Sequence, residues 1–485
     1  MSITGALSNA LTGLTAASRA TEVISSNIAN VMTEGYGRRQ LDLSARTLGP
    51  NGTGVWIDGV SRQVDQVVIS SRRLADAAAG DAGTRARYLE RIEAAIGMPD
   101  DAGSLSARLA ELETSLQLAA SRPDSSARLQ GVFTAAQSLS DHINDISNRI
   151  QSLRMEADGE IAAQVAQVNS ALQRLEQLNI DIVAHNGAGY DANGLIDQRQ
   201  QLIDSIASII PVRQIEREYG RIALISEGGA VLLDGPAATL GFDPVGVIVP
   251  EMTISSGGLN GLTLNDRPID MSGTHNPMRG GSLAALFEVR DTITVNAQAD
   301  LDAFARDLVE RFQDPAADPT LASGQAGLFT DGGSPFSTAN EIALSSRLQI
   351  NALVNPAAGG ALWKLRDGLG AASPGDIGNA VQLQRLADAL DAARVPASGS
   401  YAGAARSAAG LGADFLSLIA TQRQSVQSEA AYTSARQNAL KAQELQGGVD
   451  TDQEMQQLLL AEQAFAANAR VIQAADELIQ TLLGI

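Results

Sequence analysis

The fold is decided at the two ends of the chain, beginning with residues 3–30, ITGALSNALTGLTAASRATEVISSNIAN. Apolar and small residues recur here at alternating steps of four and three, the spacing of one apolar face on a coiled-coil helix. The row comprises Ile3, Leu7, Ala10, Leu14, Ala17, Thr21, Ile24, Ile28 and Val31. It predicts a helix of roughly eight turns whose apolar face needs a helical partner.

A second row with the same spacing lies at the other end of the chain. It comprises Leu458, Ala461, Phe465, Asn468, Ile472, Ala475, Ile479 and Leu482. The preceding Gly447-Gly448 can end one helix, and Asp450 or Thr451 can cap the next. Asn468 is either a buried amide that restricts helix register or a solvent-touched side chain on a two-faced helix. Because isolated helices are marginal in water, we expect the two ends to order fully only on pairing with each other and with neighbouring subunits.

The composition limits the classes of protein to which the chain can belong. Its 485 residues exceed one ordinary core, and aromatic residues make up only 4%, which favours helices packed through Ala, Leu and Ile. The net charge of −20 argues against binding to nucleic acid or to an anionic membrane surface. The absence of cysteine excludes disulfides, thiolate metal sites and a cysteine nucleophile. No cleaved signal peptide and no membrane-spanning segment is expected from the sequence.

Helical patterns also dominate the interior of the chain. We expect helices over 67–96, 105–120, 127–184, 195–209, 377–392 and 408–445, and one that is capped by Ser282 and runs to Phe312. In the long segment 127–184 the apolar row changes phase around Asp158-Gly159, which indicates a skip in the supercoil, a kink or a break. An extended stretch is expected near 54–62, and short strands at 212–215, 222–225, 231–233, 247–249 and 261–264. Residues 314–340 are expected to form a loop.

These patterns predict a mainly α protein with a β-rich insertion. Residues 1–36 and 447–485 supply the terminal coiled-coil helices, and residues 37–210 and 280–446 a helical bundle with an extended segment near 54–62. The insertion occupies residues 211–279.

No residue pattern predicts catalysis or metal binding. His142, His185 and His275 lack the spacing of metal ligands, and the acidic stretch 191–197 lacks the bidentate Glu of a calcium loop. The glycine-rich stretches lack the context of phosphate-binding loops, and no nucleophile elbow is present. We therefore expect no catalytic residue, no cofactor, no metal and no enzymatic activity.

Motifs at both ends resemble the signatures shared by flagellar rod, hook and hook-associated proteins. The N-terminal motif comprises ALTGL at 10–14, SSNIAN at 25–30, Gly35-Tyr36 and RRQ at 38–40, and the C-terminal motif comprises QAFAANARVI at 463–472, ADEL at 475–478 and TLL at 481–483. Three internal features resemble the hook-associated protein 1 family in particular: the helices of 127–210, NGLIDQRQQL at 193–202 and GVDTDQE at 448–454. Met32 and Glu34 depart from the Asn and Pro that the family often has there.

The resemblance implies a structural subunit at the junction between hook and filament, exported unfolded through the flagellar type III apparatus without a cleaved signal and located in the extracellular flagellum. The terminal helices would line the channel as an inner core, and the small β domain would point outward. Implied partners are further copies in a homo-oligomer, the hook protein, the second junction protein on the filament side and a dedicated export chaperone, with no nucleic acid and no membrane insertion. The expected assembly interface consists of Ile3, Leu7, Leu14, Ile24, Asn27, Ile28, Asn30, Gly35, Tyr36, Leu458, Phe465, Asn468, Arg470, Ile472, Ile479 and Leu482.

Other functions remain open at the level of sequence. Another flagellar axial protein (hook protein, the second junction protein or flagellin) would lack either the long helices of 127–210 or the Asn27 and Gly35 signature. A cytosolic coiled-coil interaction protein would have folded ends as a monomer. An inserted enzymatic domain would need a polar pocket within 211–275 or 314–400.

Overall fold

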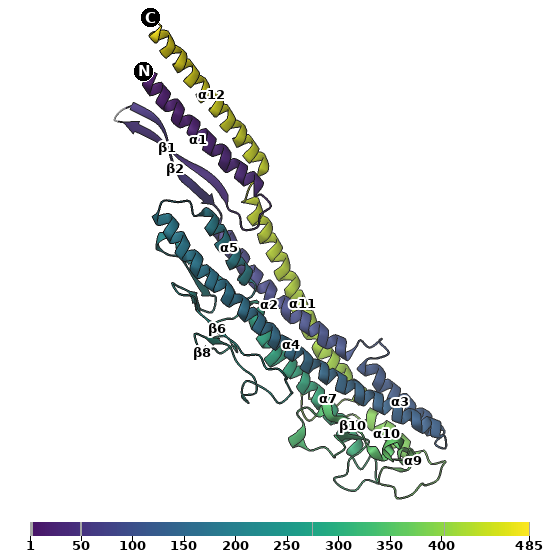
Figure 1. Cartoon of the computed structure of the whole chain (residues 1–485). Helices are drawn as coiled ribbons and strands as arrows, with labels where there is room; N and C mark the ends of the chain where they lie inside the picture. The colour runs from purple at the N-terminus through teal and green to yellow at the C-terminus, as the bar shows by residue number, and fades with distance from the viewer. Residues whose placement is uncertain (1–2, 49–50, 274, 402, 485) are drawn as a thin grey trace.

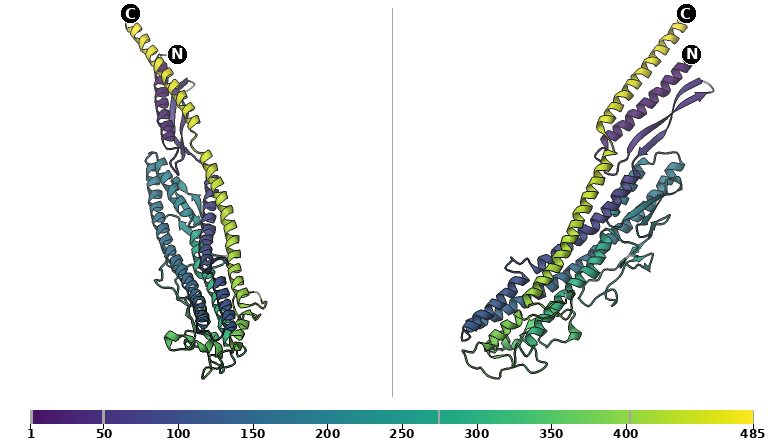
Figure 2. Two further views of the ribbon diagram at one scale, coloured as in Figure 1. Left: turned by 90° about the vertical axis from the view of Figure 1, so that its right-hand side faces the viewer. Right: turned by 180° about the vertical axis from the view of Figure 1, so that it is seen from behind.

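The computed structural model describes residues 3–48, 51–273, 275–401 and 403–484, and shows an elongated molecule with two parts along one long axis (Figures 1 and 2). The terminal part contains α1 (Ile3–Ala29), the antiparallel hairpin of β1 (Arg38–Leu48) and β2 (Asn51–Gln63), and α12 (Thr451–Leu483). Both chain ends lie at the far tip of this part. The prediction of a mainly α fold, with long helices from both ends and a small β-rich region, is confirmed.

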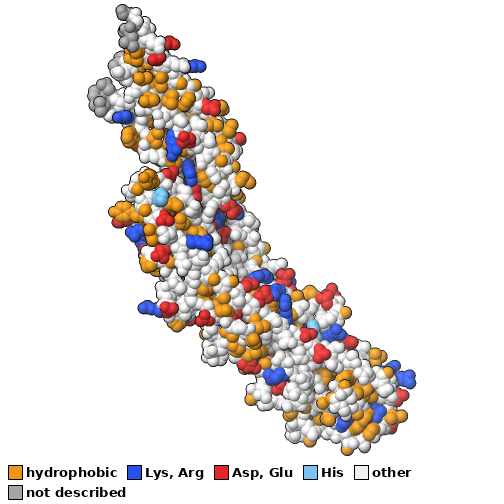
Figure 3. Space-filling model, in the orientation of Figure 1, with side chains coloured by type: hydrophobic (Ala, Val, Ile, Leu, Met, Phe, Trp, Pro, Cys, Tyr) orange, Lys and Arg blue, Asp and Glu red, His pale blue; other side chains and the backbone are white. Residues whose placement is uncertain are grey.

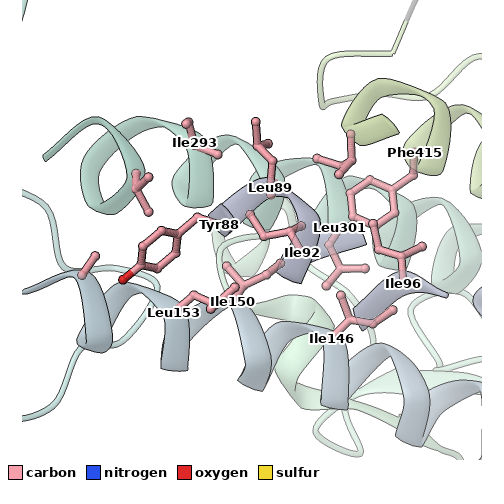
Figure 4. Close-up of a cluster of buried hydrophobic side chains, with 14 of the residues drawn as sticks. Tyr88, Leu89, Ile92, Ile96, Ile146, Ile150, Leu153, Ile293, Leu301 and Phe415 are labelled. Carbon is pink, nitrogen blue, oxygen red and sulfur yellow. The ribbon is translucent and has the colours of Figure 1, made fainter. Parts of the chain in front are cut away.

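Long helices that run along the axis form the body. They are α2 (Gln66–Ile96), α3 (Leu105–Ser121), α4 (Ser126–Gly187), α5 (Asn193–Ala207), α7 (Thr294–Gln313) and α11 (Ala408–Gln446). Figure 4 shows how their apolar faces meet: Tyr88, Leu89 and Ile92 of α2 lie against Ile150 and Leu153 of α4. Each fully buried Leu or Ile side chain of this kind stabilises the fold by about 1.5–3 kcal/mol.

The helix α4 continues unbroken through the expected phase change. Its buried positions step from Leu153 to Ala157 to Ile161, so two steps of four follow each other at this point. Such a step relaxes the supercoil locally without interrupting the helix, which selects the skip over the kink or break. Asp158, beside this step, is also buried and accepts a hydrogen bond of 2.6 Å from Arg290.

The β-rich region flanks α4 as two three-stranded antiparallel sheets. One contains β3 (Val212–Glu216), β4 (Ile222–Ser226) and β5 (Val231–Leu233), and the other β6 (Leu240–Gly241), β7 (Thr263–Leu264) and β8 (Arg267–Pro268). The expected strand at 247–249 is wrong, because this segment is irregular. Arg154 of α4 binds the backbone carbonyls of Val249, at 3.2 Å, and Met252, at 2.7 Å, in place of a neighbouring strand.

The remaining elements of the body are short. They are η1 (Glu218–Gly220), α6 (Gly281–Glu288), η2 (Val289–Ile293), β9 (Phe329–Asp331), η3 (Thr338–Asn340), α8 (Leu344–Arg347), β10 (Leu348–Ile350), η4 (Ala352–Val354), η5 (Pro356–Ala358), α9 (Trp363–Asp367) and α10 (Val381–Asp391). The η1 turn and the elements α6 and η2 lie beside the β-rich region in the chain. The 314–340 segment is therefore not only loop, since β9 pairs with β10.

Two expected helix boundaries also differ from the structure. The helix expected to start at Ser282 is capped by Gly280 instead, which has a φ of 80°, and the backbone N–H of Ser282 donates to Ser208. The N-terminal helix stops at Ala29, before Val31, where the Asn30 side chain donates to the carbonyl of Ser26 at 2.9 Å. At the other end Asp450 caps α12 as predicted, accepting from the N–H groups of Asp452 and Gln453.

Candidate assembly interface

The two terminal helices lie antiparallel and side by side (Figures 1 and 2). The N-terminal helix α1 buries Ala10, Ala17 and Ile24 from its predicted row, and α12 buries Ala461 and Ala475. The two predicted rows therefore face each other within one chain. Two contacts have the same antiparallel order: the start of α12 meets the end of α1, and the middle of α12 meets the middle of α1.

Asn27, at the end of α1, is the centre of the polar contacts at the base of this pair. Its side-chain Oδ1 accepts from the backbone N–H of Arg39 and from the Tyr36 hydroxyl, each at 2.9 Å. Its Nδ2 donates to the Arg39 carbonyl at 2.8 Å and to Glu454 Oε2 at 3.0 Å. All the hydrogen-bonding capacity of this buried amide is thus used, and the amide joins α1, the start of β1 and α12.

Glu454 lies in the first turn of α12 and is completely buried. Its second carboxylate oxygen accepts from Arg38 Nε at 2.7 Å. A buried carboxylate is costly unless it is paired, and here both of its oxygens have donors. The position near the helix N-terminus also favours a negative charge.

Asp197 on α5 connects the terminal part to the body. Its carboxylate accepts from the backbone N–H of Gly37 at 3.1 Å, from Arg62 at 2.7 Å and from Arg39 at 3.2 Å. The turn between α1 and β1 is thereby fixed to the top of the body. Gly35 in this turn has a φ of 77°, and a Cβ there would meet the Gln201 side chain at 2.6 Å.

Two further residues of the 193–202 motif extend this connection. Asn193 donates to the carbonyl of Val60 on β2 at 2.7 Å, and Arg199 donates to Asn179 on α4 and to the carbonyl of Gly220. Burial, with a smaller contribution from the neighbouring positive charge of Arg62, lowers the pKa of Arg199 to about 10. The motif therefore contributes three side chains that tie the β hairpin, the turn and α4 together.

In the middle of the helix pair, Asn468 packs directly against Gly13. A Cβ at position 13 would lie 2.7 Å from Asn468 Nδ2 and 2.8 Å from its Oδ1. The Asn468 amide is held in place by donating to the carbonyl of Ala464 at 2.9 Å. Asn468 is half-buried at the helix contact, so it is neither the fully buried amide nor a side chain clear of α1.

The other predicted interface residues divide into contacts within the chain and positions left partly open. Ile24 is buried, whereas Ile3, Leu7, Leu14, Ile28, Leu458, Ile472 and Ile479 are half-buried. Phe465 keeps 42% of its surface exposed, Arg470 is exposed, and the side chain of Leu482 lies outside the described part. Gly35, Tyr36 and Asn30 belong to the turn at the base of the pair. These placements leave the role of the residues in assembly as a prediction.

A second apolar row on α12 lies beside the row that packs on α1, about 100° further round the helix. It comprises Leu460, Ala464, Ala467, Val471, Ala474 and Leu478, which again step by four and three and are all exposed. Leu460 and Leu478 are 64% and 55% exposed. Figure 3 shows hydrophobic side chains gathered on the surface of this terminal part. Apolar patches of this kind are characteristic of protein–protein contacts.

Sequence reasoning missed four residues of this region as site residues: Gly13, Arg38, Asp197 and Glu454. Each of them lies inside a recognised motif, so the motif position was the available signal. Apolar periodicity could not have found them, because three are charged and the fourth is a glycine. Their partners also lie far away in the sequence.

Within the described residues, no helix is long and apolar enough to cross a membrane. The same part of the chain contains no cluster of three His, Cys, Asp or Glu side chains arranged to hold a metal ion.

Comparisons with protein families match three segments. Residues 89–329 match the flagellar hook-associated protein FlgK helical domain. Residues 7–36 match the flagella basal body rod protein family, and residues 446–485 match the C-terminal family of the flagellar basal body rod FlgEFG proteins. The two rod-type matches coincide with the paired terminal helices.

Individual relatives agree with these families. A flagellar hook-associated protein 1 of Bacillus subtilis is 27% identical over 66% of this chain and 68% of its own length. One from Salmonella typhimurium is 28% identical over 58% of this chain, which spans 54% of the relative's length. A solved structure, the flagellar hook junction protein FlgK from Burkholderia pseudomallei, is 20% identical with a TM-score of 0.43 and covers 54% of this chain and 47% of its own.

Proposed function

Because the chain belongs to the flagellar hook-associated protein 1 family, we propose that it is a structural subunit of the bacterial flagellum that forms the junction between hook and filament. The family matches support this role over both ends and the helical region between them. The relatives are named as hook-associated proteins, and on this proposal the chain acts through assembly and not as an enzyme.

The observation that best supports the assembly role is that α12 has two apolar rows. One row of the helix packs on α1, and the parallel row from Leu460 to Leu478 is exposed. Each square ångström of apolar surface buried against a neighbour is worth about 25 cal/mol. Burial of this row in a lattice of copies therefore stabilises both the contact and the helices that form it, and assembly is coupled to the ordering of the chain ends.

Within such a lattice, residues 1–36 and 447–485 form the inner core around the channel. Residues 37–210 and 280–446 form the surrounding helical-bundle domain, and residues 211–279 point outward. Along the axis the subunit contacts copies of itself, the hook protein on one side and the second junction protein on the other. A dedicated chaperone keeps the exposed ends from associating before export through the flagellar type III apparatus, which requires no cleaved signal peptide.

A gene deletion tests this function directly. Cells that lack the protein should build hooks but carry no attached filaments, and should not swim. Supplying the intact gene should restore both filaments and swimming. Normal motility in the deletion strain would contradict the proposed function.

A further inference from the structure

The spacing of apolar residues on α12 would allow this helix to pair with α1 through more than one face and in more than one register. Its inner row and its exposed row have the same steps of four and three, and both consist mainly of alanine and medium-sized apolar residues. Rows of this kind can pair with α1 through either face and in registers that differ by whole heptads. Apolar packing alone therefore does not explain why one face and one register are adopted.

Two contacts of a different kind lie on the inner face at matched positions. Asn27 binds Glu454 near the base of the pair, and Gly13 accommodates Asn468 in its middle. Gly13 precedes Asn27 by fourteen residues, and Asn468 follows Glu454 by fourteen. The two contacts are thus two heptads apart on both helices and define one antiparallel register.

We infer that the Asn27–Glu454 and Gly13–Asn468 contacts are the specificity determinants that select the face and the register with which α12 pairs with α1. This inference rests on the proposed function, in which the pair is the unit that assembles, and identifies the residues that direct the exposed row of α12 toward a second copy.

A slip of one heptad removes both contacts at once. Asn468 would then lie opposite Ala6 or Ala20, whose Cβ atoms occupy the space that Gly13 leaves empty. Glu454 would lose Asn27, and a carboxylate that remains buried without its donors is strongly unfavourable. Neighbouring registers are therefore disfavoured by steric conflict and by desolvation together.

A change of face is disfavoured for a related reason. Turning α12 so that the exposed row meets α1 would move Glu454 and Asn468 out of the contact and bring Leu460 and Leu478 into it. Asn27 would then be buried without its carboxylate partner. The native face instead places the Asn468 amide against Gly13, which has no side chain.

Disulfide trapping tests the inference cleanly, because the chain has no cysteine of its own. Extending the register of the two contacts along the helices puts Ala10 opposite the turn of α12 that contains Ile472, whereas a slip of one heptad brings Ala17 there. We compare the rates of cross-linking in two full-length variants, Ala10→Cys/Ile472→Cys and Ala17→Cys/Ile472→Cys, under mild oxidation. The ratio of the two rates measures register selectivity even where pairing is transient.

We expect the native pair to cross-link at least about tenfold faster than the slipped pair, as one well-made polar contact would give. Gly13→Ala should lower this ratio several-fold, because its Cβ displaces the Asn468 side chain. Adding Asn468→Ala should relieve the clash and raise the rate of the native pair, but the ratio should stay low, because neither register then carries a steric conflict. Ser18→Ala on the exposed face of α1 serves as the matched control and should leave the ratio unchanged.

An unchanged ratio in Gly13→Ala, or a ratio that Asn468→Ala restores in full, would overturn the inference. Neither result would touch the proposed function, since the deletion phenotype is read independently in cells. Conversely, a normally motile deletion strain would leave register selection in the purified chain intact.

Discussion

Asn27 and Glu454 are separated by 427 positions in the sequence, yet their side chains share a buried hydrogen bond of 3.0 Å. The contact closes the chain on itself, because it joins the last turn of α1 to the first turn of α12. Asp197 binds the adjoining turn to the body of the molecule. The terminal helices therefore leave the body from one fixed point, and their orientation is set by a few polar residues.

Glu454→Ala should weaken the pairing of the terminal helices. It leaves the buried Asn27 and the partly buried Arg38 without their acceptor, at a cost of about 2 kcal/mol, which corresponds to more than about a tenfold loss of paired state. The rate of cross-linking between Ala10→Cys and Ile472→Cys provides the measurement. Glu462→Gln, on an exposed part of the same helix, should change this rate little. Equal rates in the two variants would argue against a structural role for Glu454.

Asp197→Asn should loosen the turn that connects α1 to β1. The substitution removes the negative charge to which Arg62 and Arg39 donate, and charge-assisted hydrogen bonds of this type contribute about 1.5–3 kcal/mol. Hydrogen exchange of peptides covering residues 35–40 should become faster, while the core of α4 remains protected. Asp388→Asn, at an exposed position of α10, is the control. Unchanged exchange at Gly37 would show that the contact is dispensable.

The upper half of α11 should respond to salt more strongly than the lower half. Its lower half buries Leu411, Phe415 and Ile419, whereas from Arg423 onward this fully described helix buries only Val426 and Thr433. Polar pairs hold the upper half to α2, among them Arg423 with Glu93 at 2.5 Å, Glu429 with Arg85 at 3.2 Å, and Glu444 with Arg72.

These ion pairs are partly buried, so salt screens them less than exposed pairs, which contribute up to about 1 kcal/mol each, whereas the apolar contacts of the lower half do not depend on charge. Raising the salt concentration from about 0.1 M to about 1 M should therefore speed hydrogen exchange across residues 430–446 and leave residues 411–419 nearly unchanged. Glu444→Gln should reproduce part of the effect at low salt. A uniform response along α11 would contradict this division.

Stability should fall on mild acidification because of His142. Burial lowers the pKa of this side chain, and the positive charge of Arg108 adds to the effect, although the Ile96 carbonyl and Asp145 oppose it. The unfolded chain, with a histidine pKa of about 6.5, then binds a proton before the folded chain does. The stabilisation is present above about pH 6.5 and is lost as the pH falls through this value toward the folded pKa.

Urea unfolding at about pH 7.5 and about pH 5.5 provides the measurement for His142. His142→Gln should lose less stability between the two conditions than the unchanged chain does. His185→Gln, near the exposed end of α4, should behave like the unchanged chain. The account of His142 fails if all three proteins lose the same stability.

The sequence predicts the helices well because their signal is repeated many times. An apolar or small residue marks the same helix face at every turn in the rows from Ile3 to Ile28 and from Leu458 to Ile479. The predicted ranges also agree closely with the helices at 66–96, 126–187 and 408–446. By contrast, Val247–Val249 have the composition of a strand, but Arg154 satisfies the backbone that a partner strand would have paired. A single long-range side chain leaves no local pattern.

The polar base of the helix pair could be predicted only in part for the same reason. The N-terminal motif identifies Asn27 as a site residue. Its partner Glu454 is 427 positions away, and Asp197 is 158 positions from Arg39, so residue spacing gives no information about either contact. Phe465 illustrates the opposite error, since it has a proper place in the apolar row and yet remains 42% exposed. Periodicity identifies a face of a helix but not how completely that face is covered.

Hydrogen exchange of the chain ends, measured in dilute monomer and in isolated hook–filament assemblies, tests the central claim most directly. We predict that residues 3–29 and 451–481 exchange much faster than the body in the monomer and become strongly protected in the assembly. Strong protection already in the dilute monomer, or no gain of protection in the assembly, would contradict an interface that is completed by neighbouring copies.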